Sequence, residues 1–183
     1  MDLSQAMEVL GYYEWSNRPD GALHTEPGDP GGTTRWGLSQ RSYPNVDLTT
    51  LTLPEVTVIY NNDYWSRFHC DRFSNMFTAT QLFLAVVNMN QKRACQLLQE
   101  CANTYLESKL TVDGAIGPNS YGSINSIAEE NQASLVSDYS KAVSDYYKSL
   151  NRPQDIAGWL RRASWPNMDI GAWPYIDENW RPE

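Results

Sequence analysis

Apolar side chains recur every three or four residues along most of this chain, and that helical spacing constrains its fold more than any other feature of the sequence. Leu3, Met7 and Leu10 share one helix face with position 14, and Asp2 or Ser4 can cap the start of that helix. Further helices are predicted at about 53–65, 78–90, 92–106, 119–127, 135–150 and 153–163. We therefore predict an all-α domain of about seven helices, with a buried strand over 78–90 as the alternative for that segment.

A long loop interrupts this pattern between residues 16 and 32, where Pro, Gly, Asp and Asn replace the apolar residues. It runs into Asp29-Pro-Gly-Gly-Thr-Thr-Arg-Trp-Gly-Leu-Ser39, whose glycines permit close approach of the backbone to a ligand. A phosphate-binding loop is disfavoured because its lysine is missing and no strand is predicted before it. Asp29 and Thr34 instead offer a carboxylate and a short hydroxyl that can hold a water.

Composition excludes several classes of function. The 183 residues carry 14 basic and 22 acidic side chains, a formal net charge of -8, and they lack the clustered Lys and Arg that nucleic acid requires. A mean hydropathy of -0.55 and the lack of any apolar stretch of about 18 residues argue against insertion in a membrane. The three cysteines (Cys70, Cys95 and Cys101) have no zinc-type spacing and are expected to be reduced. We predict no metal, no cofactor and a monomer.

Glu14 is the candidate general acid on physical grounds. It falls on the apolar face of the first predicted helix, one turn beyond Leu10, at the end of that helix and beside Tyr12, Tyr13 and Trp15. Burial and the negative end of the helix dipole both favour the protonated carboxyl, which is the form that donates a proton. The competing interpretation is a solvated glutamate at a helix end.

Six motifs, in the same order, resemble glycoside hydrolase family 108, whose members are N-acetylmuramidases found as phage endolysins and secretion-associated peptidoglycan hydrolases. The resemblance spans about residues 5–163. The matching segments are Asp29–Ser39, Tyr64-Trp65, Val86-Val87-Asn88, Ala94–Gln99, Val112–Pro118 and Gly158-Trp-Leu-Arg-Arg162. Two departures affect the acid: the glycines that follow the family's glutamate are absent after Glu14, and the loop is longer. Glu26 is therefore the alternative acid.

The resemblance implies a lysozyme-like helical domain with a long N-terminal catalytic loop. Residues 1–110 would form the muramidase part and 111–183 a peptidoglycan-binding helical part packed on it. The implied reaction is hydrolysis of the β-1,4 bond between N-acetylmuramic acid and N-acetylglucosamine. Glu14 would protonate the glycosidic oxygen, and Asp29 and Thr34 would hold a water on the opposite face of the sugar, which gives inversion.

Two further residues are predicted to bind the substrate, peptidoglycan glycan strands. Trp36 could stack on a sugar and Asn88 could bond an acetamido group, but a core tryptophan and a buried structural amide are equally compatible with the sequence. The C-terminal tail, rich in tryptophan, could pack on the domain or offer a glycan or partner surface.

Three other functions remain open: a peptidoglycan-binding protein without activity, a secretion accessory protein, and a lytic transglycosylase. Because residues 1–10 do not resemble a secretory signal, we expect synthesis in the cytoplasm. The protein would then act in the periplasm or cell wall after release by a holin or another export route.

Overall fold

The structure is a computed structural model that describes residues 2–14, 21–25 and 32–165. Within this part of the chain it contains seven α-helices, a π-helical turn, a 3-10 turn and one small sheet. The helices are α1 (Leu3–Glu14), α2 (Leu53–Tyr60), α3 (Met76–Asn88), α4 (Gln91–Ala102), α5 (Pro118–Asn125), α6 (Glu129–Ser149) and α7 (Ile156–Ala163). The predicted all-α class and the number of helices are confirmed.

The small sheet was not expected. It consists of β1 (His24–Thr25), β2 (Thr33–Arg35) and β3 (Leu38–Ser39), paired antiparallel in the order β1-β2-β3. His24 lies opposite Thr34 in the first pair. Strands of two or three residues are too short to show an alternation of apolar and polar side chains, so the sequence indicated only a loop.

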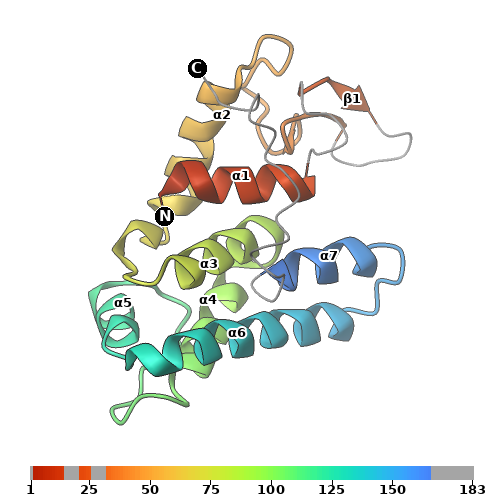
Figure 1. Cartoon of the computed structure of the whole chain (residues 1–183). Helices are drawn as coiled ribbons and strands as arrows, with labels where there is room; N and C mark the ends of the chain where they lie inside the picture. Colours follow the sequence, from red (N-terminus) through yellow and green to blue (C-terminus); the bar gives the residue numbers. More distant parts are fainter. Residues whose placement is uncertain (1, 15–20, 26–31, 166–183) are drawn as a thin grey trace.

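Helix α3 is the central element, and α1, α4, α6 and α7 all pack against it (Figure 1). Asn75 caps its start by accepting hydrogen bonds from the backbone N–H groups of Phe77 (2.9 Å) and Thr78 (3.0 Å). Nine consecutive residues from Thr78 to Val86 are buried. The prediction of a buried central helix is therefore confirmed, and the strand alternative is wrong.

The first helix begins as its sequence suggests. The Asp2 carboxylate accepts a hydrogen bond from the Gln5 backbone N–H (3.2 Å), while the Gln5 side chain accepts one from the Asp2 backbone. The predicted face of α1 is buried, with Leu10 fully enclosed. This packing against α3 determines where the end of α1 lies.

Helix α2 also starts at its predicted signal, because the Glu55 carboxylate accepts hydrogen bonds from the Thr52 backbone (2.8 Å) and hydroxyl (2.7 Å). The helix continues as a π-helical turn over Asn61–Trp65, closed by a bond from Ser66 N–H to the Asn61 carbonyl (2.8 Å). The inserted residue shifts the helix face, and Trp65 is directed into the core against Phe83 (5.6 Å between ring centroids).

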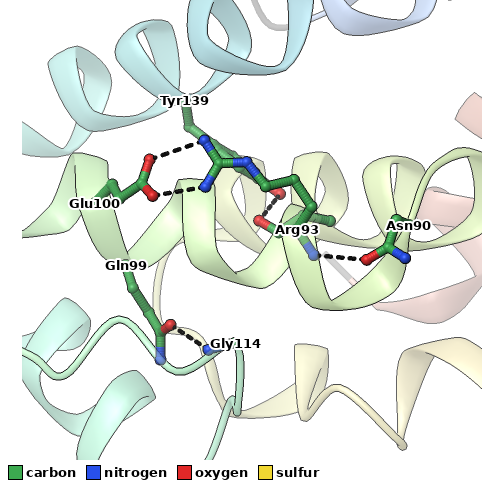
Figure 2. Close-up of polar contacts among 7 residues, drawn as sticks. Asn90, Arg93, Gln99, Glu100, Gly114 and Tyr139 are labelled. Carbon is green, nitrogen blue, oxygen red and sulfur yellow. Dashed lines mark hydrogen bonds and ion pairs between the residues drawn. The ribbon is translucent and has the colours of Figure 1, made fainter. Parts of the chain in front are cut away.

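The C-terminal helices are tied to α4 by polar contacts (Figure 2). The Tyr139 hydroxyl of α6 donates to the Ala94 carbonyl of α4 (3.0 Å). The Gln99 side chain accepts a bond from Gly114 N–H (2.8 Å), which fixes the connector between α4 and α5. Helix α4 ends at Ala102 and not near residue 106 as expected, because the next residues form turns closed by bonds such as Tyr105 N–H to the Ala102 carbonyl (2.9 Å).

The hairpin of β2 and β3 is closed by the two-residue turn Trp36-Gly37. Both residues have positive φ, 51° and 76°, as the tight hairpin turn of type I′ requires. A tryptophan in the left-handed region is strained by about 1–2 kcal/mol. Its side chain is 8% exposed and packs in the core, so burial of the ring offsets this strain. No helix in the part of the chain that the structure describes is long and apolar enough to cross a membrane.

Gly21 is expected to be essential for this packing. It has φ of 63°, and a Cβ added there would overlap the Trp36 indole. We predict that Gly21→Ala lowers the free energy of unfolding by about 2–4 kcal/mol, from backbone strain and overpacking together. Gly32→Ala is the matched control: φ is 72°, but no atom lies within 4 Å of its Cβ, so only the strain of about 1–2 kcal/mol is expected. Equal losses in urea unfolding of the two variants would contradict the proposed overlap.

Candidate active site

Glu14 is the last residue of α1, and its side chain faces the end of α7. The Arg162 guanidinium Nη1 lies 2.9 Å from Glu14 Oε1. Both side chains are mostly buried, with 22% of Glu14 and 14% of Arg162 exposed. The ion pair therefore joins the first and the last of the helices that the structure describes, at a mostly buried position.

Aromatic side chains surround this carboxyl. Tyr60 of α2 and Tyr147 of α6 are both 2% exposed. Burial is the main cause of the raised pKa of each phenol, and the charge of Glu14 raises it further. Trp159 of α7 packs on Tyr147, with ring centroids 5.1 Å apart. Burial in these surroundings raises the pKa of Glu14, while Arg162, Arg161 and a hydrogen bond from Asn88 act in the opposite direction. Desolvation is the largest of these effects, so the protonated carboxyl is favoured relative to an exposed glutamate.

The contact between Glu14 and Arg162 is close but lacks hydrogen-bond geometry. Glu14 Oε1 is fully shielded from solvent and accepts no directed hydrogen bond, although the guanidinium nitrogen is at ion-pair distance. Arg162 Nε is also buried without a hydrogen-bond partner. A bidentate pair would hold the carboxylate much more firmly in its ionised form. The observed contact therefore favours the ionised carboxylate less than a bidentate pair would.

Asn88 lies at the end of α3, next to Glu14. Its side-chain amide donates a hydrogen bond to the Leu84 carbonyl one turn earlier (2.9 Å), and its interaction with Glu14 lowers the pKa of that carboxyl. The structure thus brings together two of the residues selected from the sequence. Contact of the Asn88 side chain with the substrate stays a prediction.

Thr34 is half-buried on β2, and Trp36 lies in the turn that follows. Tyr60 connects this hairpin to the acid, since its hydroxyl donates to the Trp36 carbonyl (3.3 Å) and its ring lies within electrostatic range of Glu14. The position of Trp36 is that of a core residue; stacking on a sugar stays a prediction. Asp29, the alternative acid Glu26 and the tail beyond Trp165 lie outside the described residues.

Sequence reasoning about single positions did not identify the partners of Glu14. Arg162 was noted only as part of the Gly158–Arg162 motif, and no local signal pairs it with a residue at the other end of the chain. Tyr60 and Tyr147 belong to amphipathic patterns that predict burial but not proximity to a carboxyl.

Removal of the Arg162 charge should change the titration of Glu14 in a defined direction. Since the guanidinium lowers the pKa of this carboxyl, Arg162→Gln should raise that pKa further above its ordinary value of 4.5. Carbon NMR of the labelled glutamate carboxyl in both proteins measures the shift. Arg152→Gln, which removes an exposed arginine paired with Asp155, should leave the titration unchanged. A lower pKa in Arg162→Gln would contradict the assigned ion pair.

Part of the chain is similar to a known glycosidase family. Residues 15–89 match the profile of the family described as glycosyl hydrolase 108. This matched segment includes the hairpin, α2 and α3 up to Asn88. Glu14 immediately precedes the matched segment, so its assignment depends on the geometry above. No curated protein matches the chain.

The fold is shared with the solved structure of SagA from Brucella abortus. The two superpose with a TM-score of 0.65 at 18% sequence identity, over 92% of this chain and 97% of SagA. The match therefore extends through the helices that follow α3 as well. Residues 15–89 are thus similar to the glycosyl hydrolase 108 family, and the fold as a whole is similar to that of SagA.

Proposed function

We propose that this protein is a peptidoglycan hydrolase that cleaves the β-1,4 bond between N-acetylmuramic acid and N-acetylglucosamine, with Glu14 as the general acid. The observation that carries the proposal is the burial of Glu14 among aromatic side chains, which raises its pKa. The similarity of residues 15–89 to the glycosyl hydrolase 108 family supports a glycosidic bond as the target. A carboxyl that stays protonated at higher pH can donate to a leaving oxygen.

In the proposed reaction the Glu14 proton moves to the glycosidic oxygen as the bond from that oxygen to the anomeric carbon breaks. A water attacks the anomeric carbon from the opposite face, and its proton passes to the Asp29 carboxylate. The Thr34 hydroxyl helps to hold this water. Attack on the opposite face gives inversion at the anomeric carbon, for which the two carboxyl groups should be about 6.5–9.5 Å apart.

Arg162 and Asn88 contribute at the moment when Glu14 loses its proton. The new carboxylate is buried, and an isolated charge in such surroundings would be costly. Arg162 Nη1, 2.9 Å from Oε1, and the Asn88 amide both favour the ionised form. They therefore stabilise charge that develops in the transition state, which is the most effective use of a preorganised dipole or cation.

Replacement of the acid tests the central assignment. Glu14→Gln should lower the rate of cell-wall hydrolysis by about 10²–10⁴-fold, because general-acid catalysis is lost. Glu130→Gln, an exposed change of the same type in the first turn of α6, is the matched control and should hydrolyse at the parental rate. Retained activity in Glu14→Gln would overturn the assignment and favour Glu26.

Mass analysis of the products separates the remaining alternatives. Hydrolysis consumes one water for each glycosidic bond cleaved, whereas a lytic transglycosylase consumes none and yields anhydromuramic ends. Binding of cell walls without any new reducing ends would identify a non-catalytic peptidoglycan-binding or secretion accessory protein. Proton NMR of the first product anomer tests the inversion.

The threonine on β2 provides a second, independent test. Thr34→Val removes the hydroxyl with little change in shape, and loss of a positioned water should lower kcat by about 10–100-fold with a folded hairpin. Thr33→Val is the control on the same strand, where the hydroxyl lies 3.0 Å from that of Thr25 and has no proposed part in the reaction. Equal activity of the two variants would remove Thr34 from the mechanism.

A further inference from the structure

Arg161 is a charged group beside the candidate site that the mechanism above does not use. It is exposed, and its guanidinium carbon lies 5.7 Å from the ring centroid of Tyr12 and 5.4 Å from that of Tyr13. These two rings pack edge to face, with centroids 5.1 Å apart. Tyr12, at 38% exposure, is accessible to solvent. The arginine is thus held at the surface by aromatic contacts.

The position of this charge is next to the acid. Arg161 follows Leu160 on the last turn of α7 and precedes the arginine that contacts Glu14, and its charge lowers the pKa of Glu14. It therefore lies at the rim of the same site.

Arg161 also differs from two nearby arginines in the sequence, Arg152 and Arg162, because these two form ion pairs. Arg152 and Arg162 lie 2.8 Å and 2.9 Å from the carboxylates of Asp155 and Glu14. Among the residues that the structure describes, Arg161 makes no ion pair. The contact with the tyrosine ring faces pairs none of the guanidinium N–H groups with a carboxylate. These N–H groups can therefore donate to an external anion.

We propose that Arg161 is a substrate-binding residue that takes a carboxylate of the peptide stem carried by the glycan strand. This inference rests on the proposed function, because it places the stem at the rim of the Glu14 site. A guanidinium binds a carboxylate through two parallel N–H donors, with geometric specificity that a lysine lacks. In a chain with a net charge of -8, a fixed local cation also offsets the repulsion of an anionic strand at the point where it must approach.

A purely structural role is the competing explanation, since the contacts with Tyr12 and Tyr13 link α7 to α1. Such a role would affect stability and every substrate equally. A carboxylate-binding role would affect only substrates that carry the carboxylate.

The test measures binding by calorimetry in a Glu14→Gln background, so that cleavage does not interfere. Four probes are used: soluble glycan strands with stems, the same strands with stem carboxylates converted to amides, strands without stems, and stem-free strands that carry phosphate groups. Arg161→Gln should weaken binding of the first probe by about fivefold, the effect of a charge-assisted contact at an exposed rim, and leave the other three unchanged. Arg161→Lys should bind the first probe with intermediate affinity. Arg152→Gln, with the same change of net charge, should bind all four like its parent.

Several results would overturn the proposal. If Arg161→Gln weakens binding of all four probes equally, Arg161 has a structural role. If it weakens binding only of the phosphate-bearing strands, the site binds a wall phosphate. No loss on any probe would remove the site altogether. Binding of stem-bearing strands that depends on Arg161, together with no hydrolysis by the parental protein, would instead refute the proposed function and leave the carboxylate site standing.

Discussion

The buried contact between Glu14 and Arg162 is the interaction on which the rest of the site depends. It holds the end of α1 against the end of α7, with α3 packed against both helices. A buried carboxylate is costly unless charge and hydrogen bonds compensate it. The surroundings provide this compensation in part. Arg162, Arg161 and the Asn88 amide favour the ionised form, and burial of the carboxyl opposes it. This balance leaves the carboxyl able to hold or release a proton.

The hairpin is positioned by a second set of contacts. Its turn directs Trp36 inward, and Tyr60 holds the Trp36 carbonyl from α2. Since Tyr60 also lies within electrostatic range of Glu14, one side chain relates the hairpin that carries Thr34 to the acid. The strain of a tryptophan in the left-handed region is the local cost of this arrangement, which burial of the indole ring compensates.

The sequence predicts the helices better than the site. Periodicity located α1, the buried α3 and the face of α6, because each repeats its pattern over three or more turns. It also selected Glu14 by its neighbours Tyr12, Tyr13 and Trp15, whereas the phenols on which the Glu14 charge acts in the structure, Tyr60 and Tyr147, come from other helices. The strands were missed because they are too short for a periodic signal. The end of α4 was misplaced by about one turn because Tyr105 continues the helical spacing of Leu98 and Cys101.

The partners of Glu14 could not be found in this way, since contact between distant segments depends on how the helices pack and not on local spacing. Arg162 illustrates the difficulty. Basic residues in the last turn of a helix are common because they interact favourably with the helix dipole, so the pair in α7 indicates a helix end first of all. Only the packing of α7 on α3 and α1 shows that one of them faces the acid.

Because α7 provides the counter-charge for a carboxyl on α1, the C-terminal helices cannot be treated as an exchangeable module. A chimera that grafts them onto the loop and first helix of a distant homologue would separate two halves of one electrostatic unit. Successful recombination within this fold therefore requires that α1 and α7 come from the same parent, or that Glu14 and Arg162 are transferred together.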